Sequence, residues 1–92
     1  MNFNQQNYVV RTCKLLANAN RARIIDTLST SADLTVSALA EKLDMEVNLV
    51  SNQLIKLREN GILKARQSGV NMFYEIKDSR VVEILHLLKS LA

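Results

Sequence analysis

The sequence has a single cysteine, Cys13, and a single histidine, His86, near opposite ends of the chain. One cysteine excludes a disulfide within the chain. Proline and tryptophan are absent, and with only two glycines no phosphate-cradling glycine loop is present. No cluster of histidine, cysteine and carboxylate side chains has the spacing of metal ligands. The usual catalytic and metal-binding motifs are therefore missing, and the sequence does not predict an enzyme.

The chain also lacks a hydrophobic run long enough to cross a membrane, and its first residues, MNFNQQN, do not resemble a signal peptide. We therefore expect a cytoplasmic protein with no membrane partner. Its 92 residues predict one domain with a modest core, which a second subunit would stabilise. The 12 lysines and arginines exceed the 9 aspartates and glutamates, giving a net charge of +3. This mild excess is compatible with binding to DNA phosphates but does not establish it.

Residues 35–63 predict two helices separated by a tight break. Apolar residues at spacings of three and four place the first helix at 36–43, with Thr35 as its N-cap. The second helix occupies 47–60, and Gly61 ends it because glycine readily adopts the left-handed conformation found there. The buried stripe of the second helix is predicted to consist of Val47, Val50, Leu54 and Leu57.

A short helix, a break and a longer helix are typical of a helix-turn-helix, whose second helix enters the major groove with its early residues on base edges. The early outer residues of the second helix here are short, polar and uncharged. Asparagine can bond adenine through two hydrogen bonds, and serine suits several bases. The alternative is an ordinary solvated face, which every surface helix has. On the first interpretation, the DNA base contacts are Asn48, Ser51, Asn52 and Gln53.

After Gly61 the hydrophobic pattern changes from helical to alternating. Residues 63–67 and 71–76 alternate around a serine-glycine turn, which indicates a β-hairpin. A hairpin directly after a recognition helix is the wing of a winged helix. Lys64 and Arg66 share one strand face, although strand cations are also common as plain solvent-facing charges. The predicted DNA backbone contacts are Arg21, Lys56, Lys64, Arg66, Gln67 and Ser68.

Helical patterns also precede and follow this unit. One occupies 21–30, capped by Asn18 or Asn20, and the last occupies 80–92, capped by Asp78. The last helix is apolar most of the way round, so one small domain cannot cover it. We therefore expect a homodimer, formed with an N-terminal helix alongside, that could read a pseudo-palindromic operator. The expected interface consists of Tyr8, Val9, Cys13, Leu16, Val81, Leu85 and Leu88.

Four segments, in this order, resemble the ArsR/SmtB family of small dimeric winged-helix repressors. They are LANANRARII at 16–25, LTVSALA at 34–40, VSNQLIKLRENGIL at 50–63, and the aromatic pair Phe73-Tyr74. The resemblance covers most of the chain. Within the family, the chain is similar to the HlyU and BigR group. It implies a mainly α fold, a winged helix-turn-helix with four helices, a small β-hairpin and a fifth helix. It also implies dimerisation through the first and last helices and repression by binding double-stranded operator DNA.

The residues at the family's metal-sensing positions differ here. The resemblance places Thr35 and Ser37 where sensing members have cysteines, and hydroxyls are poor ligands for soft metals. A second family site needs paired aspartate and histidine on the last helix. This chain has His86 there with Asp78 and Glu83, and lacks a second histidine. We expect no metal and no cofactor, and the sequence does not identify the effector.

The HlyU and BigR group carries a cysteine pair at positions that the resemblance assigns to Asp26 and about Ser90, so that dithiol switch is missing. Cys13 is either a small buried residue of the apolar face or a thiol close to its symmetry mate in the dimer. Val70 stands at the wing tip, where relatives often have arginine. With Val47 early in the second helix, it favours an alternative function, a winged-helix module that binds protein and not DNA.

Overall fold

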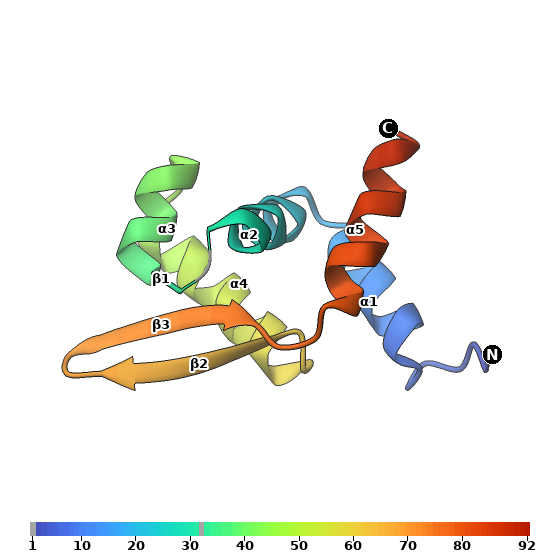
Figure 1. Cartoon of the computed structure of the whole chain (residues 1–92), viewed down its shortest axis with the longest axis horizontal. Helices are drawn as coiled ribbons and strands as arrows, with labels where there is room; N and C mark the ends of the chain where they lie inside the picture. The colour runs from blue at the N-terminus through green and yellow to red at the C-terminus, as the bar shows by residue number, and fades with distance from the viewer. Residues whose placement is uncertain (1, 32) are drawn as a thin grey trace.

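The computed structural model of the chain describes residues 2–31 and 33–92. The elements follow the order α1 (Tyr8–Leu16), α2 (Ala19–Thr30), β1 (Leu34–Thr35), α3 (Val36–Leu43), α4 (Val47–Glu59), β2 (Leu63–Ser68), β3 (Asn71–Ile76) and α5 (Arg80–Ser90). The molecule measures 41 × 25 × 20 Å. The β2–β3 hairpin extends from one end, and α1 and α5 pack together at the other (Figure 1). The winged helix-turn-helix predicted from the sequence is confirmed.

Polar side chains fix where three of the helices begin. Asn7 Oδ1 accepts the backbone N–H of the first turn of α1, and Asn18 Oδ1 accepts that of Arg21 at 3.1 Å in α2. Thr35 Oγ1 accepts the N–H of Ala38 at 3.1 Å, which confirms the predicted cap of α3. Such caps satisfy amides that have no partner within the helix. Because Asn18 is the cap, α2 begins two residues earlier than predicted.

The last helix differs slightly from its prediction at both ends. Ser79 occupies the N-cap position, but Asp78 Oδ1 still accepts the N–H of Arg80 at 3.0 Å, so the predicted carboxylate does satisfy a first-turn amide. The helix ends at Ser90 and not at the final residue. None of the helices in residues 2–31 and 33–92 is both long and apolar enough to span a membrane.

The sheet contains one strand that the sequence did not predict. β1, β3 and β2 lie side by side in that order and are antiparallel, with Leu34 opposite Tyr74 and Leu63 opposite Ile76. A two-residue strand is too short to show alternation, so β1 is detectable only from its partner. It anchors the start of α3 to the base of the wing.

The inner face of the recognition helix packs into the core beneath the wing and against α2 and α3. Val50, Leu54 and Leu57 are completely buried, as predicted, and burying each contributes about 2 kcal/mol relative to exposure. Val47 was predicted in the same stripe, and this is wrong, because its side chain is 49% exposed. It is the first residue of α4, where the helix has not yet reached the core.

Candidate nucleic-acid interface

The early outer face of α4 carries the polar side chains expected to contact bases. Asn48 and Asn52 are exposed and lie one turn apart, and Ser51 between them is half-buried. Within the described ranges, none of the three side chains has a hydrogen-bond partner. Their amide and hydroxyl groups can therefore bond an external donor or acceptor. The buried stripe on the opposite side of α4 holds this face toward solvent.

The fourth predicted base contact, Gln53, is bonded inside the protein. Arg21 Nη1 donates to Gln53 Oε1 at 3.1 Å, and Arg21 Nε donates to the carbonyl oxygen of Leu15 at 2.7 Å. Both side chains are half-buried. This arrangement joins α2 to α4. To contact DNA, either side chain would have to break these internal hydrogen bonds or use donor and acceptor sites that the bonds leave free.

The two predicted phosphate contacts on the wing are each paired with a carboxylate. Lys64 Nζ lies 3.2 Å from Glu75 Oε1, and Arg66 Nη2 lies 2.6 Å from Asp33 Oδ2. Arg66 also covers the ring of Phe73, with its Cζ 4.9 Å from the ring centre. Exposed ion pairs of this kind contribute only about 0–1 kcal/mol, so a phosphate could compete for either cation.

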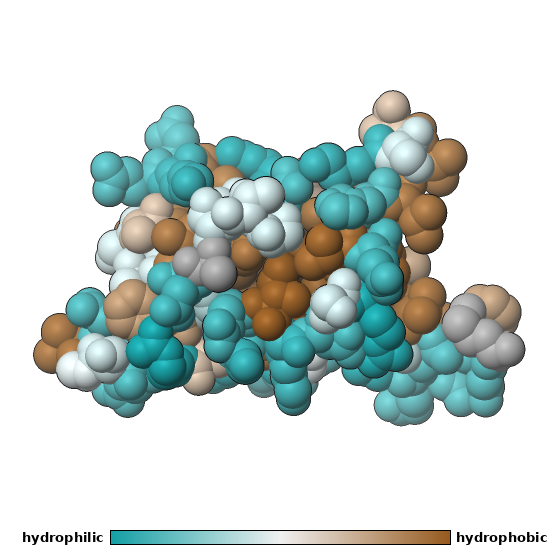
Figure 2. Space-filling model, in the orientation of Figure 1, coloured by the Kyte–Doolittle hydropathy of each residue, from teal (hydrophilic) through white to brown (hydrophobic). Residues whose placement is uncertain are grey.

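The tip of the wing is polar apart from one hydrophobic side chain. Gln67 and Ser68 are exposed, and Gln67 Nε2 donates to the carbonyl oxygen of Gly69 at 3.4 Å. Val70 is 99% exposed, and Figure 2 shows hydrophobic atoms at this end of the hairpin. Gln67 and Ser68, the two predicted DNA backbone contacts, are therefore accessible to a phosphate. Val70 beside them is apolar and has no charge with which to bind one.

The predicted dimer face divides into exposed and buried residues. Leu16, Val81 and Leu85 are buried within the single chain, and their place in the interface stays a prediction. They face the chain's own core because that side of α1 and α5 packs on α2. Tyr8 and Val9 are half-buried.

The exposed side of α5 includes two leucines, Leu87 and Leu91, that the sequence did not place in the interface. Leu87 is 67%, Leu88 40% and Leu91 86% exposed, and Figure 2 shows hydrophobic side chains over this part of α5. An apolar face of this kind on a small protein is typical of an interaction surface. Of these three residues, the sequence analysis had predicted Leu88.

Cys13 is exposed on α1, so the interpretation as a small buried residue is wrong. The inward positions of this helix belong to Thr12, Leu15 and Leu16. Among the described residues, no group of three histidine, cysteine or carboxylate side chains is placed to hold a metal ion.

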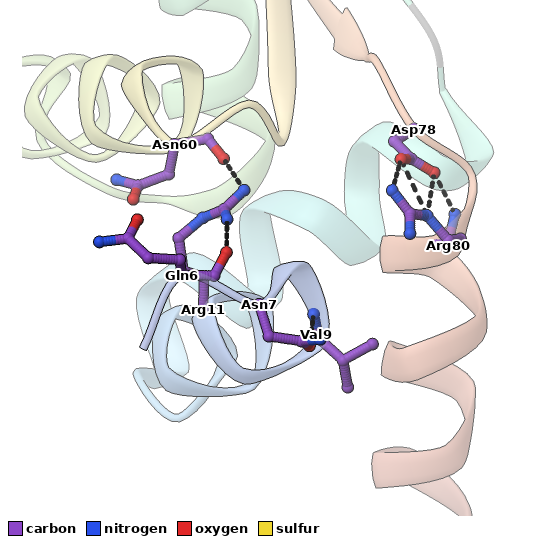
Figure 3. A network of polar contacts seen from close by, with 7 residues as sticks. All are labelled: Gln6, Asn7, Val9, Arg11, Asn60, Asp78 and Arg80. Atoms are coloured by element: carbon purple, nitrogen blue, oxygen red, sulfur yellow. Dashed lines mark hydrogen bonds and ion pairs between the residues drawn. The ribbon is translucent and has the colours of Figure 1, made fainter. Parts of the chain in front are cut away.

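A charged cluster ties the start of α5 to α1. Arg80 Nη2 lies 2.6 Å from Asp78 Oδ2, and its Cζ lies 4.0 Å above the ring of Tyr8, a cation–π contact. Hydrogen bonds from Arg80 lower the pKa of Asp78, while burial raises the pKa of the Tyr8 phenol. Figure 3 shows the Asp78–Arg80 pair at the start of α5. Tyr8 therefore helps to hold the terminal helices together within one chain.

Two helices with an outward-facing second helix, followed by a hairpin wing, define a winged helix-turn-helix of the DNA-binding class. Residues 16–66 match the family described as "Helix-turn-helix domain". The chain is 32% identical over 78 residues to the transcriptional regulator MJ1325 of Methanocaldococcus jannaschii, covering 85% of this chain and 88% of the relative. The chain belongs to the ArsR/SmtB family of helix-turn-helix transcriptional regulators, which are not enzymes. This confirms the family resemblance.

Solved structures agree with this assignment. The crystal structure of the AntR antimony-specific transcriptional repressor is 40% identical, with a TM-score of 0.84 over 90% of this chain and 75% of AntR. The homodimeric winged helix-turn-helix DNA-binding domain of Mb0332 from Mycobacterium bovis is 30% identical, with a TM-score of 0.77 over 91% of this chain and 77% of the domain. The chain spans 37% to 63% of the length of several mycobacterial regulators that it also matches.

Proposed function

We propose that this chain binds operator DNA in a sequence-specific manner and represses transcription. The observation that carries the proposal is the unoccupied polar face of α4, formed by Asn48, Ser51 and Asn52. This face lies opposite a completely buried stripe. Uncharged amides and hydroxyls at the start of a recognition helix suit hydrogen bonding to base edges in the major groove. Repression would follow from occlusion of a promoter that contains the operator.

We further propose that the active form is a homodimer joined through α1 and α5. The exposed leucines of α5 support this, because a two-fold partner would cover the same face on both copies. The Mb0332 domain is itself homodimeric. Two recognition helices about one duplex turn apart would read a pseudo-palindrome. Operator DNA requires a protein in the compartment that holds the genome, so the expected cytoplasmic location is part of this proposal.

The test is a binding titration, by fluorescence anisotropy, against duplexes selected from a random pool and from the promoter region of the protein's own gene. Ser51→Ala and Asn52→Ala should each lower the affinity for the selected duplex by about tenfold to one hundredfold, which is what a good base contact contributes. The salt dependence should stay the same, because base contacts release no counterions. Ser90→Ala on α5 is the matched control and should bind like the parent. Equal binding by all variants would exclude α4 from the groove.

A second candidate function is binding to another protein through the winged-helix surface. Val47 at the start of α4 and Val70 at the wing tip are both strongly exposed, and apolar side chains at these places suit a protein partner. The same titration separates the two candidates. Absence of salt-dependent duplex binding by the parent protein would favour the protein partner, whereas tight selected binding would exclude it as the main function.

A further inference from the structure

A basic hollow, not expected from the sequence, lies where α1, the start of α2 and the end of α4 meet. Its volume is about 280 Å³. Four of the chain's 12 lysines and arginines line it, namely Arg11, Lys14, Arg21 and Lys56. Among the described residues that line it, none is acidic. Glu59 is the acidic group close by, on the wall of the neighbouring depression that shares Arg11.

Neutral oxygen atoms hold three of these cations, Arg11, Lys14 and Arg21, in place. Arg11 Nη1 donates to the carbonyl oxygen of Gln6 at 2.6 Å, and Nη2 donates to that of Asn60 at 3.4 Å, so α1 is joined to the end of α4 (Figure 3). Lys14 Nζ donates to Gln5 Oε1. Each guanidinium and ammonium keeps N–H groups that these bonds do not use, and such groups bond anions strongly.

The cations that line the hollow form no ion pair within the described part of the chain. The ion pairs found in residues 2–31 and 33–92 use four other cations, namely Lys64, Arg66, Arg80 and Lys89. Like charges gathered in one place repel one another, and a bound anion removes that repulsion. The start of α2 adds the positive end of a helix dipole.

We propose that this hollow binds a phosphate group, and that the backbone of the duplex held by α4 supplies it. This inference rests on the proposed function. Asn48, Asn52 and Lys56 follow one another at four-residue spacing on one face of α4. The rise from Asn48 to Lys56 is about 12 Å, close to the width of the major groove. With Asn48 at the bases, the backbone that borders the groove passes Lys56 and enters the hollow beside Lys14.

The decisive variant is Lys14→Gln, because among the described residues this exposed side chain bonds only Gln5, and its loss leaves the core intact. The charge-matched control is Lys89→Gln, on the far part of α5, where the lysine pairs with Asp26 at 3.0 Å. Duplex binding is titrated over a salt series for the parent and both variants. We expect Lys14→Gln to lower the affinity for all duplexes by the same factor. The slope of log affinity against log salt concentration should become shallower by about two per dimer, one phosphate for each hollow. The control should keep the parent slope.

A second arm uses inorganic phosphate without DNA and follows the backbone amides of the parent and of Lys14→Gln by NMR. A shallower salt slope for Lys14→Gln supports the hollow with DNA as its phosphate source. An unchanged slope with saturable phosphate shifts that Lys14→Gln abolishes supports the hollow with a small phosphorylated molecule as its source. An unchanged slope without such shifts overturns the proposal. If the parent binds no duplex, the proposed function fails, and the phosphate arm alone decides the hollow.

Discussion

Arg21 Nη1 donates a hydrogen bond to Gln53 Oε1 at 3.1 Å, and this bond joins α2 to α4 through two residues that are 32 positions apart in the chain. From the sequence, Arg21 was predicted to contact a DNA phosphate and Gln53 to contact a base. In the structure they bond each other, and Arg21 also bonds the end of α1 through Leu15. The pair therefore fixes how the recognition helix sits on α2 before any DNA is present.

The first prediction concerns this pair. Arg21→Ala removes both bonds and leaves the half-buried Gln53 oxygen without its donor. We expect a loss of about 1–3 kcal/mol in the free energy of unfolding, measured by urea denaturation. Gln53→Ala should cost less, and the double variant should cost less than the sum, by about 0.5–1.5 kcal/mol. Strict additivity would show that the two residues act independently.

The second prediction concerns the exposed face of α5. Replacing Leu87 and Leu91 together by glutamate places two charges in the proposed interface, where they would be buried without partners. Sedimentation equilibrium should then report half the parent mass. Val70→Glu is the control, because that valine is also apolar and exposed but lies at the wing tip, so the variant should keep the parent mass. A double leucine variant that still dimerises would place the interface elsewhere.

The third prediction concerns the end of the recognition helix. Gly61 has a φ angle of +75°, and a Cβ added to it would meet no other atom within 4 Å. Gly61→Ala should therefore lose only the backbone preference, about 1–2 kcal/mol, which lowers the melting temperature by roughly 4–16 °C in a domain of this size. Gly61→Asn should lose less, because asparagine tolerates this conformation. Equal melting temperatures for the parent and Gly61→Ala would show that the turn relaxes without strain.

The fourth prediction concerns the pH dependence of stability. Hydrogen bonds from Arg80 hold the pKa of Asp78 below its usual value of 3.8. Below that value the unfolded chain binds more protons than the folded one, so stability falls as the pH falls through the folded-state pKa. The contribution is complete above about pH 4 and is lost in stronger acid. Asp78→Asn should be less stable than the parent at pH 7, and the two should converge in acid. A constant difference across the acid range would exclude the ion pair as its cause.

Features with a local cause were predictable from the sequence. Thr35 caps a helix through an amide three residues away, and Gly61 ends one by its own backbone freedom. The alternation at 63–76 reports a hairpin whose partners are close in the chain. The family signature is equally a matter of sequence order. In each case the interacting residues are near neighbours in the chain, so the local sequence pattern is enough to predict the structure.

The sequence by itself thus determined the order of the helices and the hairpin, the helix-turn-helix and the family. Tertiary structure decided which side of the apolar α5 faces inward, burying Val81 and Leu85 and exposing Leu87 and Leu91. It also decided that Arg11 meets the end of α4 at Asn60 and so completes a basic hollow. A helix that is apolar most of the way round has no unique inner face in its sequence pattern, and contacts between distant segments leave no periodic signal. Packing of the whole chain is what selects among the alternatives.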